Sequence, residues 1–272
     1  MILKIYLFMI IFLVMSASRA DMYPMIIGGA EVAPSDPIAK STVFIEGQLI
    51  RSSFYCTGSI IATDLILTAG HCLGGAGNAR LTVYFRTRFD GPGERIAVVD
   101  QIRKMDTIPQ DVSSWEDIAI LRLATAIPPG YQAAHFLDDS SLLQVGQTVV
   151  LAGYGRTAPE PSSSGQQQGL GVLRTVEQNI LQTQYNANEF LVDLSGGKGS
   201  CQGDSGGPAF IRRGSDLLLA GAVSDMTEKD RLLPDLPRQQ KRYSCSVDMV
   251  YTNILAQMSW IQSAILELRK TK

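Results

Sequence analysis

The sequence predicts an all-β fold of two six-stranded antiparallel β-barrels followed by a C-terminal α-helix. Short β-rich runs recur along the chain after residue 25, and turn-forming residues separate them. Glycine is plentiful, at 25 of 272 residues, whereas aromatic residues make up only 7%, which suits many short strands joined by tight turns. Closing these strands into barrels removes exposed sheet edges.

About six strands are expected in each half of the chain. Those of the first half are residues 42–45, 58–62, 65–68, 81–85, 96–102 and 118–123. Those of the second half are residues 147–152, 173–180, 189–194, 207–212, 217–223 and 249–254. Two prolines and a glycine at residues 128–130 disfavour both sheet and helix, so we place a domain boundary there, between domains at 26–130 and 131–272.

The end of the chain changes to a helical period. Apolar residues recur at 254, 255, 258, 261, 265 and 268, behind Thr252 or Asn253 as the N-cap. An apolar stripe with charged residues opposite is more often packed on its own domain than on a membrane or a partner, and we expect that here. Residues 159–169 and 227–242, rich in Ser, Gln, Pro and charge, predict surface loops.

The first twenty residues have the pattern of a secretory signal. Lys4 precedes an apolar run from Ile5 to Met15, and small residues lead to Ala20, after which we expect cleavage. The apolar run is shorter than the roughly 20 residues that cross a bilayer, so no stable membrane insertion is expected after cleavage. The mature chain is therefore expected in an extracellular or periplasmic compartment. The net charge of −2, with scattered basic residues, argues against a nucleic-acid partner.

Four cysteines occur in this exported chain, and their even number predicts disulfides. Three pairings are open, and spacing alone does not choose among them. A zinc site is disfavoured because no two cysteines are closely spaced and only one histidine adjoins a cysteine, so no metal or cofactor is expected. The four are Cys56, Cys72, Cys201 and Cys245.

The strongest chemical signal is the sequence GDSGGP at residues 203–208, preceded by Cys201 and Gln202. A serine is a useful nucleophile when a base removes its proton and the surrounding chain leaves its oxygen exposed. Glycines on both sides of Ser205 permit unusual backbone angles and let backbone N–H groups approach a substrate carbonyl closely. This run therefore indicates a nucleophilic serine.

The base for Ser205 must be one of two histidines. His71 follows an apolar strand in LTAGHC, whereas His135 lies in AAHF with no polar neighbour, so His71 is the better candidate. The second nitrogen of an imidazole base needs a carboxylate to fix its tautomer. Asp117 suits this role because it opens the buried run DIAIL, while Asp106, Asp111 and Glu116 lie in more polar sequence.

Four runs together make the chain resemble the chymotrypsin family of serine proteases. They are IIGG at 26–29, TAGHC at 68–72, DIAIL at 117–121 and GDSGGP at 203–208, in the order His, Asp, Ser. The resemblance implies the chymotrypsin-like fold and an endopeptidase that forms an acyl-enzyme on Ser205. It also implies an oxyanion hole from the N–H groups of Gly203 and Ser205, and protein or peptide substrates for a monomeric enzyme.

The resemblance further implies that the chain is a zymogen with a short propeptide at residues 21–25. Cleavage before Ile26 would create an ammonium group that pairs with Asp204 and orders the oxyanion hole. Met25 is not basic, so another protease is expected to activate the chain. The implied disulfides are Cys56–Cys72 and Cys201–Cys245.

The substrate pocket departs from the family pattern. Its floor, six residues before Ser205, is Gly199, which disfavours Arg and Lys side chains because no carboxylate is there. One wall is expected from Ser224, with Met226 narrowing the cleft, and Ser224 as a hydrogen-bond partner of Asp117. In the other wall either Met249 or Asp248 faces inward; Met249 would favour small apolar side chains, whereas Asp248 would admit basic ones, and we favour Met249.

Two other functions compete with an endopeptidase. A catalytically silent secreted binding protein on a protease scaffold is suggested by Met25, Met226 and the long 227–242 insertion, against a complete set of triad residues. An α/β-hydrolase esterase is disfavoured because the candidate residues occur in the order His, Asp, Ser, whereas that class has the order Ser, Asp, His.

Overall fold

The computed structural model describes residues 26–74, 79–105, 115–158, 167–194, 196–226, 245 and 248–270. The expected signal and propeptide, residues 1–20 and 21–25, lie outside the described residues. So do the expected loop at 227–242 and most of the one at 159–169.

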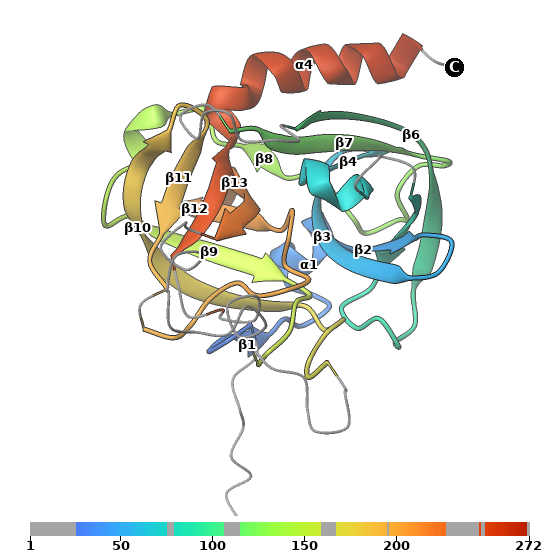
Figure 1. Cartoon of the computed structure of the whole chain (residues 1–272), viewed down its shortest axis with the longest axis horizontal. Helices are drawn as coiled ribbons and strands as arrows, with labels where there is room; N and C mark the ends of the chain where they lie inside the picture. The colour runs from blue at the N-terminus through green and yellow to red at the C-terminus, as the bar shows by residue number, and fades with distance from the viewer. Residues whose placement is uncertain are drawn as a thin grey trace, which may run out of the picture.

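The first barrel closes in the order β2-β3-β4-β7-β6-β5, at the right of Figure 1. Successive side chains of a strand point to opposite faces, and β2 uses both: Val43 and Ile45 fill the barrel, while Phe44 joins the cluster shared with the second barrel. The strands are β2 (Thr42–Gln48), β3 (Ser53–Ala62), β4 (Leu65–Thr68), β5 (Arg80–Phe85), β6 (Glu94–Met105) and β7 (Asp117–Leu123).

The second barrel closes because β9 pairs with both β10 and β12, while β10-β11-β14-β13-β12 run side by side. Its strands are β9 (Thr148–Gly153), β10 (Arg174–Asn186), β11 (Glu189–Val192), β12 (Pro208–Arg213), β13 (Asp216–Met226) and β14 (Met249–Asn253). All twelve barrel strands overlap the expected runs, and the predicted fold class is confirmed.

The two barrels share a buried apolar cluster, to which Phe44 and Ile118 contribute from the first barrel and Tyr154 and Phe210 from the second. The hydroxyl of Tyr154 donates to the carbonyl oxygen of Arg86 at 2.6 Å, which joins the barrels by a buried polar contact as well. The shared core fixes the groove between the barrels, where residues from both can meet.

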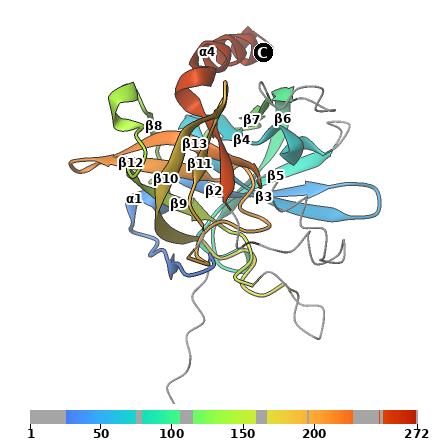
Figure 2. The ribbon, with the colours of Figure 1, turned by 60° about the vertical axis from the view of Figure 1, so that its left-hand side comes forward.

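The C-terminal helix α4 (Ile254–Lys270) packs across both barrels, against β13 and β14 of the second and β6 and β7 of the first (Figures 1 and 2). The Asn253 carboxamide oxygen accepts the Leu255 N–H at 3.0 Å, so Asn253 is the cap. The helix was expected to pack on its own domain, the second barrel. In the structure it packs on the first barrel as well. No helix within the described ranges is long and apolar enough to cross a membrane.

The start of the described chain packs with the second barrel. Strand β1 (Ala30–Glu31) pairs with β10, and Ile26 is buried among the core side chains of that barrel. The division at 26–130 instead groups residues 26–31 with the first barrel, because the strand pattern carries no sign of this pairing. Short elements that the sequence did not predict are α1 (Pro37–Ser41), η1 (Gly70–Leu73), β8 (His135–Phe136) and η3 (Ser140–Leu142).

Candidate active site

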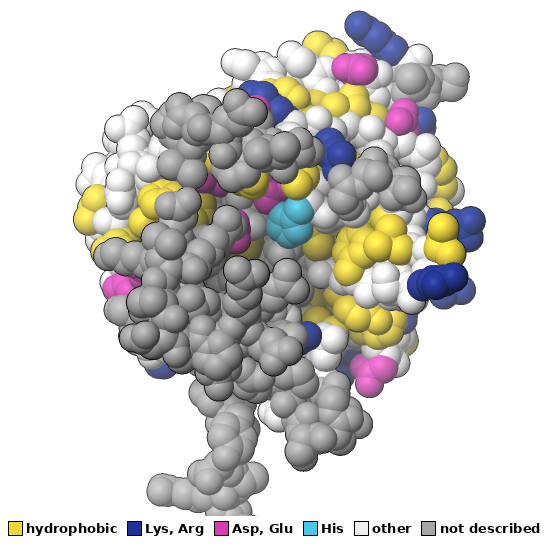
Figure 3. Space-filling model, viewed as in Figure 1, with side chains coloured by type: hydrophobic (Ala, Val, Ile, Leu, Met, Phe, Trp, Pro, Cys, Tyr) yellow, Lys and Arg dark blue, Asp and Glu magenta, His cyan; other side chains and the backbone are white. Residues whose placement is uncertain are grey.

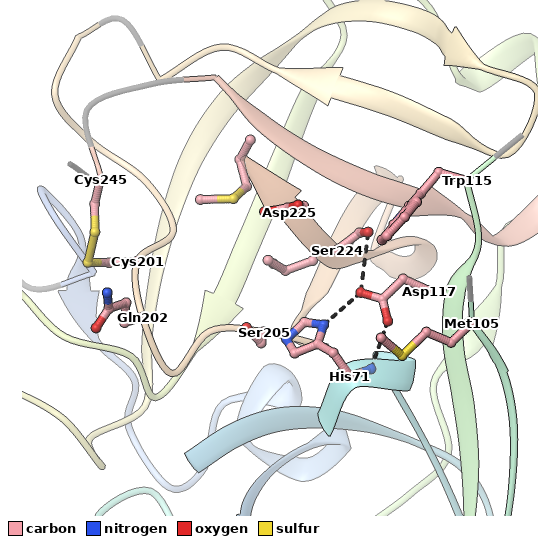
Figure 4. Close-up of a pocket in the computed structure, with 12 residues that line it drawn as sticks. His71, Met105, Trp115, Asp117, Cys201, Gln202, Ser205, Ser224, Asp225 and Cys245 are labelled. Carbon is pink, nitrogen blue, oxygen red and sulfur yellow. Dashed lines mark hydrogen bonds and ion pairs between the residues drawn. A yellow bond between two sulfur atoms is a disulfide. The ribbon is translucent and has the colours of Figure 1, made fainter. Parts of the chain in front are cut away.

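His71 and Asp117 meet at the groove between the barrels through two contacts. Nδ1 of His71 lies 2.7 Å from Oδ2 of Asp117, and the backbone N–H of His71 donates to Oδ1 at 2.8 Å. The two contacts fix the direction of the imidazole, leaving Nε2 on the other side of the ring. Ser205 lies on that side (Figure 4).

Two paired strands bring His71 and Asp117 into contact. His71 lies in the single turn η1 directly after β4, and Asp117 is the first residue of β7, which pairs with β4. Only glycine fits at position 70, because a Cβ there would lie 2.9 Å from the Met105 side chain and 3.1 Å from Oδ1 of Asp117. The side chain of Asp117 is 3% exposed, whereas that of His71 is 37% exposed. The ring therefore opens toward solvent while its carboxylate partner does not.

The first barrel holds the Ser205 loop through Thr57, a residue that the sequence analysis did not single out. The backbone N–H of Thr57 donates to the Ser205 carbonyl at 2.9 Å, and its hydroxyl donates to the Gly203 carbonyl at the same distance. These two bonds tie the loop that carries Ser205 to the first barrel. Among the described residues, neither the Gly203 nor the Ser205 N–H donates to a protein acceptor. Two donors are thus available beside Ser205.

Asp204 points away from the groove into the second barrel and is fully buried. Its carboxylate accepts the backbone N–H groups of Gly155 at 2.7 Å and Cys201 at 2.8 Å. Burial raises the pKa of Asp204 to about 7, although the two N–H groups and the charge of Arg174 act in the opposite direction. Asp204 is therefore a buried acid whose ionised form lacks a close cation within the described chain.

The pKa of His71 is raised above the ordinary histidine value. Burial alone would lower it, but the charge of Asp117, its hydrogen bond and the weaker charge of Asp225 outweigh the burial. The imidazolium form is thus favoured by carboxylates on one side of the ring. A base with a raised pKa accepts a proton more readily, so the position suits general-base chemistry.

His71, Asp117 and Ser205 line one cavity of about 230 Å³. In Figure 3 a histidine side chain reaches the surface beside acidic side chains, on the face where the barrels meet. The cavity wall is otherwise mostly apolar, and Asp225 is its additional charged residue. The remaining lining residues are Met105, Trp115, Cys201, Gln202, Val223, Ser224, Cys245 and Met249.

The expected pocket residues fall into three groups. Ser224 and Met249 line the cavity, and Ser224 approaches Oδ2 of Asp117 at 3.4 Å. Asp248 does not line it; its carboxylate lies 3.5 Å from the backbone N–H of Leu194 instead. The Met226 side chain lies outside the described part of the structure.

Gly199 does not form an open floor. The side chain of Leu194, itself fully buried, occupies the space above Gly199, where an added Cβ would lie 2.4 Å from it. Gly199 also has a φ of +142°, which strains any other residue, and it pairs with Ile27. The expected floor position is therefore covered by an apolar side chain that the six-residue spacing does not reveal.

Both implied disulfides are present, and each lies beside a candidate site residue. Cys56 pairs with Cys72, next to His71, and Cys201 pairs with Cys245 in the cavity wall. Cys56, His71 and Cys72 lie close together, but both sulfurs are committed to the disulfide, so this group does not provide thiolate ligands for a metal.

One buried carboxylate near the site was missed by the sequence analysis. Glu189, the first residue of β11, is 2% exposed, and its Oε1 accepts the Ser224 hydroxyl at 2.8 Å. Burial raises the pKa of Glu189 to about 7, against the hydrogen bonds from Ser224 and Asn186. No local sequence signal marks this residue, because its nearness to Asp117 arises only when the barrels pack.

The chain is similar in sequence to several known proteins. The sequence model of the Trypsin family matches residues 26–236. The chain is 27% identical to Brachyurin of Leptuca pugilator over 192 residues, which cover 67% of this chain and 80% of that protein. It is 28% identical to Fibrinolytic enzyme, isozyme C, of Lumbricus rubellus over 252 residues, 87% of this chain and 98% of that protein.

The fold also matches a solved structure. The structure titled "Structure of GrC" superimposes with a TM-score of 0.66 at 22% identity, covering 88% of this chain and 98% of that one. At this identity the likeness concerns the fold alone, and it extends over both barrels.

Proposed function

Because the chain belongs to the trypsin family and is a chymotrypsin-like serine endopeptidase, we propose that Ser205, His71 and Asp117 are its catalytic triad. The observation that carries this proposal is the double contact of Asp117 with His71, through Nδ1 and the backbone N–H, in a cavity that Ser205 also lines. It orients the ring so that Nε2 is free to take a proton from the serine.

In the proposed reaction, Oγ of Ser205 attacks the substrate carbonyl while Nε2 of His71 takes its proton. Asp117 stabilises the imidazolium that forms, and the N–H groups of Gly203 and Ser205 bind the developing oxyanion. His71 then gives its proton to the leaving amine, which departs and leaves an acyl-enzyme on Ser205. Water, deprotonated by His71, hydrolyses this ester and restores the free enzyme.

Activation by cleavage before Ile26 is the second part of the proposal. Ile26 is already buried in the second barrel, and Ile27 pairs with Gly199, five residues before Asp204. A new ammonium group at Ile26 would supply a cation to an acid whose burial raises its pKa to about 7. Residues 21–25 would be removed by another protease, since residue 25 is methionine. We propose that the enzyme acts outside the cytoplasm as a monomer, on protein or peptide substrates, without cofactor, nucleic acid or membrane insertion.

For specificity, we propose a preference for small apolar side chains at the cleaved bond. The support is the lining by Met249 and Val223, together with Leu194 above Gly199. A cationic side chain would find no carboxylate at the covered position 199. A peptide library cut by the processed enzyme should show small apolar residues before the cleaved bond. Dominant cleavage after Arg or Lys would reject this preference without affecting the triad.

The triad is tested with a fluorophosphonate probe, which phosphonylates a serine only when that serine is activated. Processed chain beginning at Ile26 should be labelled, and Ser205→Ala should abolish the labelling. A well-folded processed chain that is not labelled would instead support a silent binding protein on a protease scaffold.

A further inference from the structure

Glu189 is connected to Asp117 of the proposed triad through Ser224 and does not itself line the cavity. Ser224 stands between the two carboxylates, with its Oγ 2.8 Å from Oε1 of Glu189 and 3.4 Å from Oδ2 of Asp117. The other carboxyl oxygen of Glu189 accepts the side-chain amide of Asn186 at 2.6 Å. Glu189, Ser224 and Asp117 are all buried, so water does not replace these contacts.

A serine hydroxyl has one proton, so Ser224 can donate to only one of the two carboxylates at a time. When Glu189 is ionised, the shorter distance directs this proton to Oε1 of Glu189. Asp117 then lacks that hydrogen bond. When Glu189 is protonated, its own O–H can donate to Oγ of Ser224, and the serine proton is released toward Oδ2 of Asp117. The protonation of one acid thus sets the hydrogen bonding of the other.

The charged groups around Glu189 favour such a coupling. Asp117 at the start of β7 and Asp225 of β13 both disfavour its ionised form. From β14, Thr252 lies opposite Glu189 and donates its hydroxyl to the Asp117 carbonyl at 3.0 Å. Within the described residues Glu189 has no ion pair with a cation, and its hydrogen-bond donors are Ser224 and Asn186.

We propose that Glu189 is a positioning residue for the active site, which acts through the Ser224 hydroxyl on Asp117 and thereby on the basicity of His71. This inference rests on the proposed function. Ionised Glu189 adds a negative charge near the imidazole and withdraws the Ser224 proton from Asp117. Both effects favour the imidazolium, so loss of the Glu189 charge should lower the pKa of His71.

The test is the pH dependence of fluorophosphonate labelling of the processed enzyme. Glu189→Gln keeps the shape and can donate its amide to Ser224, so it mimics protonated Glu189 at every pH. The acid limb of the labelling rate should move to lower pH, and the rate at high pH should remain close to that of the wild type. In Ser224→Ala the same substitution should produce a smaller shift, because the connecting hydroxyl is gone.

Controls separate this coupling from general damage. Glu177→Gln, on the outer face of β10 at 62% side-chain exposure, should leave the acid limb in place. Should Glu189→Gln fail to fold, Asn186→Ala offers a second test. This substitution removes the amide that supports ionised Glu189 and does not alter a contact of Asp117. It should also move the acid limb of the labelling rate to lower pH.

The outcomes are distinct for the two proposals. An acid limb in the wild type that does not move in folded Glu189→Gln overturns the positioning role and leaves the triad intact. A shift of equal size with and without the Ser224 hydroxyl overturns the route through that hydroxyl. Absence of any Ser205-dependent labelling in the wild type rejects the proposed function itself.

Discussion

Two buried aspartates flank Ser205, and they differ in what accompanies them. Asp117 faces the groove, where it contacts the backbone and ring of His71, a residue that can carry the opposing charge. Asp204 faces the second barrel, where two backbone N–H groups hold it and burial raises its pKa to about 7. Asp117 therefore has its partner, His71, in place. Asp204, in contrast, has no ion pair with a cation among the described residues.

This difference separates two tasks of the proposed enzyme. Contacts within and between the barrels position the base, and these form when the chain folds. The oxyanion donors lie on the loop that Asp204 supports, so their final order is proposed to depend on the ammonium group of Ile26. On this proposal, the chain folds with the contact between His71 and Asp117 already formed and remains inactive until it is cut before Ile26.

Removing the charge of Asp117 should have the largest effect. Asp117→Asn can donate its amide to Nδ1 of His71, which fixes the tautomer whose Nε2 carries a proton and cannot accept one from Ser205. We expect kcat/KM of the processed enzyme to fall about 10⁴-fold. The neighbouring Glu116→Gln is the matched control, because Glu116 pairs with Lys104 and not with His71. Similar losses in both variants would contradict the assigned role of Asp117.

Asp204 should make the uncut chain less stable as the pH rises. Its pKa is about 7 in the folded chain against an ordinary 3.8, so between these values the folded state holds a proton that the unfolded chain has released. The unfolding free energy should therefore fall from pH 4 to pH 8, by up to roughly 4 kcal/mol from this residue.

Urea unfolding of the uncut chain with Ser205→Ala measures this dependence, and adding Asp204→Asn should flatten it. The comparison isolates Asp204, since Glu189 and His71 are present in both proteins. If the unfolding free energy of the two proteins had the same pH dependence, the pKa of Asp204 would not be raised in the folded chain.

A smaller effect concerns His71. Because the charges of Asp117 and Asp225 raise its pKa above the ordinary 6.5, kcat/KM should begin to fall above that pH as the solution is acidified. The fall should approach tenfold per pH unit at lower pH. Asp225→Asn removes the charge with the weaker effect on His71. The fall in kcat/KM should then occur at a lower pH than in the wild type. A flat profile from pH 5 to 8 would rule out His71 as the base.

The sequence was sufficient to predict the fold, and local features were sufficient to single out Ser205 and His71 as candidate residues. Alternating apolar residues and frequent turn signals mark barrel strands locally, and a glycine-flanked serine is a local feature too. Asp117 was recognised only through the other motifs, since a lone aspartate before an apolar run has many explanations. Leu194 above Gly199 was not foreseen, because its contact depends on how a loop folds back over the chain.

Residues that act across the barrel boundary were also beyond the sequence. Thr57 reaches the Ser205 loop from β3, and Glu189 reaches Asp117 through Ser224. Thr57 and its partner Gly203 are 146 residues apart in the sequence, and no periodicity connects the two positions. Such contacts follow from the packing of two separately patterned halves, which only the three-dimensional structure supplies.

The most direct test compares two enzymes that differ by one residue at the N-terminus. One begins at Ile26 and the other retains Met25, so only the first has an ammonium group at Ile26. With a peptide chosen from the library, kcat/KM should be about 10²–10³-fold higher for the chain beginning at Ile26, the size expected for an ordered oxyanion donor. Equal kcat/KM for the two chains would contradict activation through Asp204.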